Sequence, residues 1–586
     1  MEGYKDRLHS DFIRVLRLHP GDDADIKVSI TTVQLSAKPS FIALSYTWGN
    51  PLDEHHPSYQ GDYDNVKHHL CCTGERLPVG RNLYETLQQL LQGQESSPLW
   101  IDAMCINQND PEEISHQLSL MPRIYDEASQ VVVWLGKEDP TAHEAIQTLD
   151  GLQCQILEAT FGGPTSGLST LIPVRKRRAV ANLFRRRWFS RVWTLQEAVL
   201  PARIRYLCGP YNLEADVANM FASVLLRDLA SAEDASKIWE SYDKLPIGQL
   251  SAAACIGGWR GVTWSGGGFD ERAFLRYPKI DCALEVPRTL KWLVTLELYV
   301  HETRPRNCQK PEDKVRAPLA FALNKKFTPT MPEFHLLERH ARQMLDCRIP
   351  WMELYPMFTQ FIIDSMANLD ILSRAHRDVE CDDATEMLSL PSWVPPFQAA
   401  GTTSLIDDLL FTKFNAASYL GAYRVNDCRT GALELPVRAT FFGRVAQIST
   451  HAAPADSPAA WFSHVRKSER FQQEIESRHC RDLAHVAIAT IGDDLERIIK
   501  WEAERERQRQ PFLRGLLSMT TILQINTSVS RAAMRRLFYF DVNGYQSIGL
   551  GPQIAQVSDH LCVLQGAKVP VILRETPEPG KYNTGW

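Results

Sequence analysis

The sequence predicts an α/β protein in which the first 210 residues hold a parallel sheet with helices on both faces. Three observations predict this. Short apolar segments alternate with amphipathic helical segments between residues 41 and 209. Helical periodicity dominates from 211 to 380, and short alternating strand patterns return near the C-terminus. We therefore divide the chain into residues 1–210, a mainly helical region at 211–400 and a smaller β-rich region with a charged helical insertion at 401–586.

The first elements are a hairpin, a buried strand and a helix. "FIRVLRLHPG" and "DIKVSITTVQL" alternate apolar and polar residues around a Pro-Gly pair, which predicts the hairpin. "FIALSYTWGN" at residues 41–50 begins as an apolar run bounded by turn formers, which is typical of a strand covered on both faces. After a polar insertion at 51–66, the leucines of "NLYETLQQLLQ" recur at helical spacing.

The next segments continue the alternation. "PLWID" predicts a strand that ends at Asp102, and Asp110, Pro111 and Glu113 mark a helix start as N-cap, first helical residue and capping-box acid. Pro122 inside that helix costs about 3 kcal/mol or forces a kink. "VVVWLG" predicts a strand, "WFSRVWTLQEAVL" a helix stopped by Pro201, and "RIRYLCG" another strand.

Beyond residue 210 the pattern is less regular. Helices are predicted for "ANMFASVLLRDL", "RTLKWLVTLELYV" and "LYPMFTQFIIDSM", with a loop at "GWRGVTWSGGGF" and a connector at "LPSWVPPF". Residues 417–450 and 535–575 predict strands, with Asn543-Gly544 as a hairpin turn. "DDLERIIKWEAERERQRQ" predicts a solvated helix.

Composition excludes several classes of protein. The 586 residues carry 64 basic and 70 acidic side chains, a net charge of -6, so there is no basic field to attract nucleic acid. The 13 cysteines are scattered and never spaced C-x-x-C, which predicts a reduced, cytoplasmic protein without a structural metal or other cofactor. No apolar stretch has the length of a signal peptide core or a membrane span.

Three blocks, "FIALSYTWG", "LWIDAMCINQNDPEE…HQLSLMPRIYDEASQVVVWLG" and "RRWFSRVWTLQEAVL", stand in a fixed order. They resemble the three motifs of the fungal heterokaryon incompatibility (HET) domain. "IRVLRLHPG", "KPEDKVRAPLAFAL", "LPSWVPPF" and "GLGPQIAQVSDHLCVLQGAKVPVILR" also resemble segments of longer HET proteins, which usually continue through another strand segment after the last of these.

The resemblance implies a role in non-self recognition and programmed cell death, an innate-immunity function of filamentous fungi. HET domains are held to be distant relatives of Toll/interleukin receptor (TIR) domains, which implies a flavodoxin/TIR-like sheet. Some TIR domains cleave NAD with a glutamate that follows a tryptophan at Trp-x-x-x-Glu spacing. Trp193 and Glu197 have that spacing here.

The candidate ligand site lies where two parallel strands end, because ligands of open parallel sheets bind beyond the carboxyl ends of the strands. The first strand ends in Ser45, Tyr46, Trp48 and Gly49, and the second is followed by Asp102, Asn107 and Gln108. For the first strand, the alternative is a Trp and Tyr that close the core. Asp102 is either a ligand contact or a helix cap. Asn107 and Gln108 also fit a role in fixing the loop.

Glu197 is the candidate catalytic residue, with Arg191 and Trp193 as further ligand contacts. If residues 186–200 form one helix, Ser190, Trp193 and Glu197 share a face. One carboxylate suffices to cleave NAD because nicotinamide leaves as a neutral molecule, whereas ordinary glycosidases need a second carboxylate to protonate the leaving oxygen. The alternative is an ion pair between Glu197 and a nearby arginine. The clusters "RKRR" and "RRR" fit an import signal, a phosphate-binding surface or a solvated helix face.

Two functions follow from this sequence. The first is an effector enzyme that hydrolyses NAD or a related nucleotide and is activated by self-association. The second is a non-enzymatic module that binds another HET protein or a receptor. A third, a DNA-binding regulator, rests on the two arginine clusters and is opposed by the overall charge.

Overall fold

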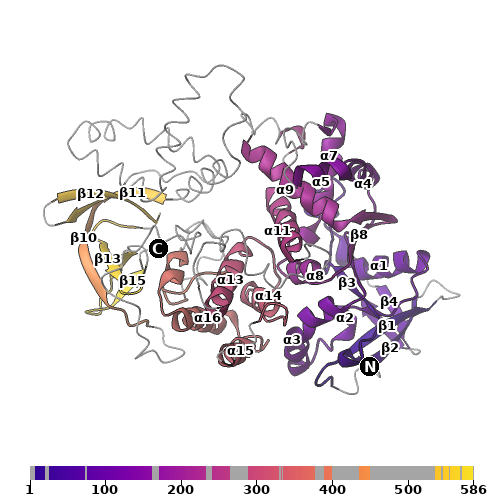
Figure 1. Cartoon of the computed structure of the whole chain (residues 1–586), viewed down its shortest axis with the longest axis horizontal. Coiled ribbons are helices and arrows are strands. Elements are labelled where there is room, and N and C mark those ends of the chain that lie inside the picture. Colours follow the sequence, from indigo (N-terminus) through magenta and orange to yellow (C-terminus); the bar gives the residue numbers. More distant parts are fainter. Residues whose placement is uncertain are drawn as a thin grey trace. The chain divides into compact units, whose positions relative to one another are not determined.

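A mixed sheet forms the centre of the N-terminal part of the chain (Figure 1). The computed structural model describes residues 7–19, 26–66, 68–72, 75–160, 171–231, 240–243, 245–263, 288–328, 332, 334–375, 389–398, 434–448, 535–542, 545–552, 555–567 and 571–584. Within these ranges the sheet has nine strands in the order β5-β4-β2-β1-β6-β3-β7-β8-β9. They are β1 (Phe12–His19), β2 (Ile26–Gln34), β3 (Ile42–Tyr46), β4 (His68–Cys72), β5 (Glu75–Val79), β6 (Leu99–Trp100), β7 (Gln130–Trp134), β8 (Ile204–Cys208) and β9 (Tyr211–Glu214).

The four strands β6, β3, β7 and β8 are parallel to one another and form the middle of the sheet. Every residue of β3 is buried, as expected for a strand covered on both faces. The predicted parallel sheet is therefore confirmed, and so is the N-terminal hairpin, in which β1 pairs with β2 from Phe12↔Gln34 to His19↔Lys27. The β4–β5 hairpin was not predicted. It adds to the sheet through a parallel pairing of β4 with β2.

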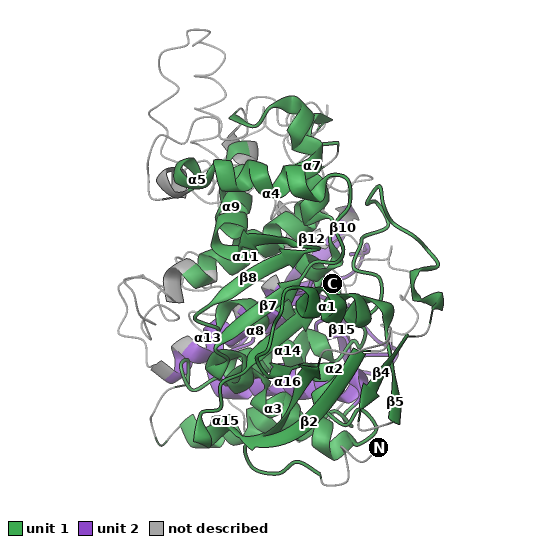
Figure 2. Cartoon of the chain, turned by 90° about the vertical axis from the view of Figure 1, so that its right-hand side faces the viewer, with its two compact units in different colours: residues 1–281, 305–349 green, residues 282–304, 350–586 purple. Residues whose placement is uncertain are grey.

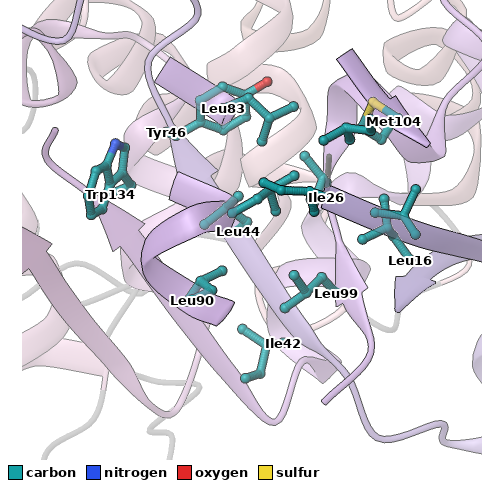
Figure 3. Packing of buried hydrophobic residues seen from close by; sticks show 14 of the residues in the cluster. Leu16, Ile26, Ile42, Leu44, Tyr46, Leu83, Leu90, Leu99, Met104 and Trp134 are labelled. Carbon is teal, nitrogen blue, oxygen red and sulfur yellow. The ribbon is translucent and has the colours of Figure 1, made fainter. Parts of the chain in front are cut away.

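Helices cover the two faces of the parallel strands. Helix α1 (Arg81–Gln92) contributes leucines to one face, where they pack with Ile42, Leu44 and Tyr46 of β3 (Figure 3). On the other face Trp100 of β6 meets Tyr125 of α3 (Pro111–Glu127) edge to face, at 5.4 Å between ring centroids. Ala43 and Ser45 are the β3 residues on that face, since alternate residues of a strand point to opposite sides. Small side chains there leave room for the segment around α8 (Thr194–Val199).

The start of α3 differs from the prediction in one respect. Asp110 is the N-cap, and its carboxylate accepts hydrogen bonds from the backbone N–H groups of Glu112 and Glu113. Glu113 does not complete a capping box, because its carboxylate binds Arg14 of β1 instead. The helix runs through Pro122 to Glu127 without ending.

Residues 186–200 do not form one helix, contrary to the prediction. Arg187–Ser190 form a 3-10 turn, Arg191 is extended, and α8 starts only at Thr194. The reason is a tertiary pairing with a distant segment. Asn307 accepts a hydrogen bond from the N–H of Val192 and donates its own N–H to the carbonyl of Ser190, so these backbone groups are not available to a helix. Similarly, β6 ends at Trp100, and Asp102 is the first residue of the short helix α2 (Asp102–Cys105) rather than the end of a strand.

The chain divides into two compact units, coloured separately in Figure 2: Met1–Asp281 with Pro305–Ile349, and Cys282–Arg304 with Pro350–Trp586. The first unit also holds α4 (Ala142–Gly151), α5 (Gln153–Thr160), α7 (Val174–Phe184), α9 (Ala215–Ser231), α11 (Ile247–Thr263), α14 (Asp313–Ala322) and α15 (Phe334–Gln343). The predicted loop "GWRGVTWSGGGF" is helical up to Thr263, and its remainder lies outside the described residues.

The second unit combines helices with an antiparallel sheet. Its helices are α13 (Arg288–Glu302), α16 (Trp351–Met366) and the 3-10 turn Asp370–Arg374. Its described strands run in the order β12-β11-β10-β13-β14-β15. They are β10 (Ala439–Ile448), β11 (Arg535–Val542), β12 (Tyr545–Pro552), β13 (His560–Leu564), β14 (Val571–Glu575) and β15 (Tyr582–Thr584). The strand regions are thus confirmed where they are described, whereas "DDLERIIKWEAERERQRQ" and Asn543-Gly544 lie outside the described residues.

Candidate functional site

A pocket of about 490 Å³ opens beyond the carboxyl ends of β3 and β6. All of its walls belong to the first compact unit. They come from the residues that follow β3, from the α2–α3 segment, from the stretch between the 3-10 turn and α8, and from residues 307–316 with Cys347. Residues from all three motif blocks therefore line one cavity. Residues 307–316, which are far away in the sequence, line it as well.

The tip of β3 and the start of α2 are joined by a tryptophan. The indole N–H of Trp48 donates to the carboxylate of Asp102, with nitrogen–oxygen distances of 3.1 and 3.3 Å. The backbone N–H of Ala103 donates to the same carboxylate at 2.7 Å. Trp48 is 39% exposed and lines the pocket with Asp102, so both are within reach of a ligand. The prediction that Ser45–Trp48 and Asp102 lie at one edge of the sheet is confirmed.

Glu197 is buried beneath the pocket and bonded from the strand. The indole N–H of Trp188 donates to Ser45 Oγ at 2.6 Å, and the Ser45 hydroxyl donates to Glu197 Oε2. Glu197 lines the pocket. Among the described residues no donor bonds its second oxygen, Oε1. This oxygen is the part of the carboxylate that is available to a ligand.

Arg191 links Glu197 to the strand tip. Its Nη1 lies 3.6 Å from Glu197 Oε2 and donates to the backbone carbonyl of Tyr46 at 2.5 Å. The side chain of Glu197 is 3% exposed and that of Arg191 19%. The ion pair that the sequence offered as an alternative for Glu197 is therefore present, and it is buried in the pocket wall.

Two further carboxyl groups in the pocket ionise less readily than usual. Burial raises the pKa of Asp102 from its ordinary value of 3.8 to about 6, against the opposing effect of Arg191. Burial also raises the pKa of Asp313 to about 6, although a hydrogen bond from Trp193 opposes the shift. Both groups are mostly charged at pH 7 and mostly neutral at pH 5.

Sequence reasoning missed the wall that residues 307–316 provide. Asp313, Lys310 and Asn307 line the pocket, and Asn307 is held there by its pairing with Ser190 and Val192. Trp193, the tryptophan of the Trp-x-x-x-Glu spacing, lowers the pKa of Asp313 through a hydrogen bond. The segment "KPEDKVRAPLAFAL" resembles part of longer HET proteins, and this resemblance was the signal that could have drawn attention to it. Its composition does not indicate that it contacts residues more than a hundred positions earlier.

Several predicted site residues do not line the pocket. Ser45 lies behind Glu197, and Tyr46 points to the opposite face of the sheet, where it packs near Leu83 (Figure 3). Gly49 has a φ of 78°, and a Cβ there would lie 3.0 Å from Asp64 Oδ2, so it serves the turn. Asn107 accepts a bond from the N–H of Asn109 at 3.2 Å and fixes its own loop. Gln108 lines the pocket and also donates to the backbone carbonyl of Asp102 at 2.9 Å.

The arginine clusters have separate roles. Arg185 and Arg186 are buried, and their guanidinium groups bind Asn182 and Asp139 respectively. Arg187 lines the pocket. In the other cluster, Arg178 pairs with Asp243 at 3.1 Å and Arg175 is exposed.

The described residues hold no group of three or more His, Cys, Asp or Glu side chains that could bind a metal ion. The nine described cysteines are free thiols. None of the helices in the described ranges has both the length and the apolar character needed to cross a membrane.

These features define an α/β domain with a charged pocket at the carboxyl edge of its parallel strands. Residues 41–197 match the family model "Heterokaryon incompatibility protein (HET)", and the chain therefore contains a HET domain. It is 33% identical to "Heterokaryon incompatibility protein 6, OR allele" of Neurospora crassa. That match covers 34% of this chain and 33% of the relative, so it spans about a third of the relative's length. No solved structure matches the chain.

Proposed function

We propose that this protein is an effector of heterokaryon incompatibility whose HET domain hydrolyses NAD or a related nucleotide and so promotes cell death. The name of the Neurospora crassa relative supports the incompatibility role. In this proposal residues 1–210 carry the HET domain, 211–400 and 401–586 are accessory regions, and the protein acts in the cytoplasm. The observation that carries the enzymatic part is the buried Glu197, with Oε2 held by Ser45 and Oε1 facing the pocket.

The order of the parallel strands supports a flavodoxin/TIR-like site. In chain order β3 is the first, β6 the second, β7 the third and β8 the fourth, so the spatial order is second, first, third, fourth. This is the order at the start of flavodoxin-like sheets, whose ligands bind where the first and third strands adjoin. Ser45 of β3 faces Val133 of β7 at that place.

The chemistry requires little from the protein. The bond between the nicotinamide nitrogen and ribose C1′ breaks, its electron pair returns to the cationic ring, and neutral nicotinamide leaves. Water then adds to C1′ and releases a proton. Glu197 stabilises the developing positive charge on the ribose and accepts hydrogen bonds from its hydroxyls, while Trp48 offers an exposed ring for stacking.

One observation favours the second function, a non-enzymatic module that binds another HET protein or a receptor. Arg191 lies 3.6 Å from Glu197 and neutralises part of its charge. A neutralised carboxylate stabilises a cation less well. On this reading the exposed Trp48 and the pocket rim are a docking surface.

The test is release of nicotinamide from NAD by the purified protein. Glu197→Gln keeps the size and the acceptor for Ser45 but removes the charge, and we expect a rate loss of about a hundredfold or more. Because Glu197 is buried, thermal melting must show that the variant folds. A well-folded Gln variant with full activity would exclude Glu197 as the catalytic group. Cell killing by the parent protein with normal cellular NAD would favour the docking module.

Self-association is a further part of the proposal. An enzyme completed by a neighbouring copy gains specific activity as its concentration rises. Sizing and activity measured over one concentration series address this. Constant specific activity from a monomer would contradict it.

A further inference from the structure

The pocket holds four cationic side chains, and two of them are committed elsewhere. Arg191 binds Glu197 and the Tyr46 carbonyl. Arg316 donates to the backbone carbonyls of Met344, Asp346 and Ile349. Arg191 and Arg316 therefore stabilise the pocket walls through contacts with other protein groups.

The other two, Arg187 and Lys310, form no salt bridge with a described residue, although the charge of Lys310 lowers the pKa of Asp313 in the same pocket wall. The backbone of Arg187 is fixed, since its N–H donates to the Pro51 carbonyl at 2.8 Å. Its guanidinium carbon lies 5.7 Å from the centre of the Tyr59 ring, which leaves the N–H donors at its edge unused. Lys310 lies in the segment that Asn307 joins to residues 190–192, and its side chain is exposed.

The pocket wall carries acids and bases together. The side chain of Glu197 is 3% exposed, whereas that of Glu54, another acid of the wall, is 70% exposed. Among the cations, Lys310 is at the surface. Pairs of cations suit phosphate oxygens in particular. A volume of about 490 Å³ lies within the range of small-molecule sites.

We propose that Arg187 and Lys310 bind the phosphate groups of a nucleotide whose ribose faces Glu197. The inference rests on the proposed nucleotide hydrolysis and specifies its substrate class: the pocket takes phosphorylated nucleotides in preference to nucleosides. It assigns a role to Lys310, which lies outside the segment that matches the HET family model.

The experiment measures binding to the full chain by calorimetry, with ADP-ribose and AMP as phosphorylated probes and adenosine as the uncharged probe. We expect ADP-ribose to bind more tightly than adenosine, and Arg187→Ala or Lys310→Ala to weaken ADP-ribose by roughly tenfold or more while leaving adenosine unchanged. Arg175→Ala and Lys325→Ala are matched controls, because both residues are exposed and lie outside the pocket. Adenosine binding as tight as ADP-ribose, or a double variant that binds ADP-ribose as well as the parent, would overturn the proposal.

The outcome is separable from that of the proposed hydrolysis. In one case, binding depends on the phosphate groups and on Arg187 and Lys310, but no nicotinamide is released from NAD. This result would support the phosphate site and refute the hydrolase. In the reverse case, nicotinamide is released as fast from nicotinamide riboside as from NAD, and the double variant releases it at the same rate as the parent. This result would support the hydrolase and refute the phosphate site.

Discussion

At the scale of single residues, Glu113 is a buried carboxylate with a full set of donors. Arg14 Nη1 binds it at 2.5 Å, and the backbone N–H groups of Asn107 and Leu8 donate to it at 2.7 and 3.3 Å. Burial alone would raise the pKa of Glu113, but these donors hold it below the usual value. One acid thus joins β1, the loop before α3 and the N-terminal segment.

Glu113→Gln should destabilise the protein by about 3 to 5 kcal/mol, because it leaves the buried charge of Arg14 without its carboxylate. The neighbouring Glu112 is 56% exposed, so Glu112→Gln is a matched control that should change the melting temperature little. Chemical denaturation of both variants measures the difference. Equal stability of the two would show that Arg14 does not depend on Glu113.

Asp102 is the opposite case, a carboxylate whose charged form the fold disfavours. The pKa of Asp102 rises from 3.8 to about 6 on folding, so this carboxyl group binds more protons in the folded than in the unfolded chain between these values. The contribution of Asp102 to the stability therefore falls as the pH rises from about 4 to about 6.

Asp102→Asn removes this cost and keeps an oxygen for Trp48 and Ala103. We expect the variant to be more stable than the parent by roughly 1 to 3 kcal/mol at pH 7.5, with the difference vanishing near pH 4. Melting curves at several pH values measure it. A variant less stable than the parent at pH 7.5 would mean that the hydrogen bonds of the carboxylate outweigh its burial.

At the scale of elements, helices α9 and α11 pack closely at a glycine. A Cβ on Gly257 of α11 would lie 3.1 Å from the backbone of Asn219 in α9, whereas a Cβ on Gly258 would meet nothing within 4 Å. The two adjacent glycines have the same intrinsic cost in a helix, about 1 kcal/mol relative to alanine. Only their surroundings differ.

We therefore expect Gly258→Ala to stabilise the protein by about 0.5 to 1 kcal/mol and Gly257→Ala to be less stable than that variant by about 1 kcal/mol or more. Equilibrium unfolding in denaturant gives both values. If the two alanine variants are equally stable, the α9–α11 contact can relax without cost.

Elements with a strong local pattern could be predicted from the sequence. The strand at 42–46, the helix capped by Asp110 and the hairpin of β1 and β2 each carry their own signal in apolar spacing or turn residues. The stretch around Arg191 could not, because its backbone is set by Asn307, more than a hundred residues away. The pocket follows the same rule: strand ends indicated Trp48 and Asp102, and the Trp-x-x-x-Glu spacing indicated Glu197, but no local pattern indicated the wall formed by residues 307–316.

At the scale of the whole molecule, the pocket depends on a segment beyond the family match. Residues 307–316 supply Lys310 and Asp313, and Asn307 binds the backbone on both sides of Arg191. Apart from Cys347, the other lining residues lie in the segment that matches the HET model, 41–197. The HET motifs alone therefore do not make a complete cavity.

A chain ending at Glu214 should melt at a lower temperature than a chain ending at Ile349 and should bind ADP-ribose at least tenfold more weakly. It loses the cation of Lys310 and leaves the N–H of Val192 and the carbonyl of Ser190 without their partners. Calorimetry of the two chains beside the full protein measures both effects. Equal binding by the shorter chain would show that the wall at 307–316 is dispensable.

If Glu197 binds the ribose as proposed, the bond from Trp188 to Ser45 also affects which ligands this carboxylate accepts. An indole nitrogen can only donate, so the Ser45 oxygen must accept, and the single hydroxyl hydrogen of Ser45 is left to point at Glu197. The direction of that hydrogen is set by a ring buried away from the pocket. Glu197 Oε2 therefore accepts a hydrogen bond from Ser45, and Oε1 is left to accept one from a ligand. A sugar hydroxyl can donate to Oε1, whereas a ligand group that only accepts hydrogen bonds cannot bind there. In the proposed site, Trp188 therefore affects ligand binding through Ser45 and Glu197 without lining the pocket itself.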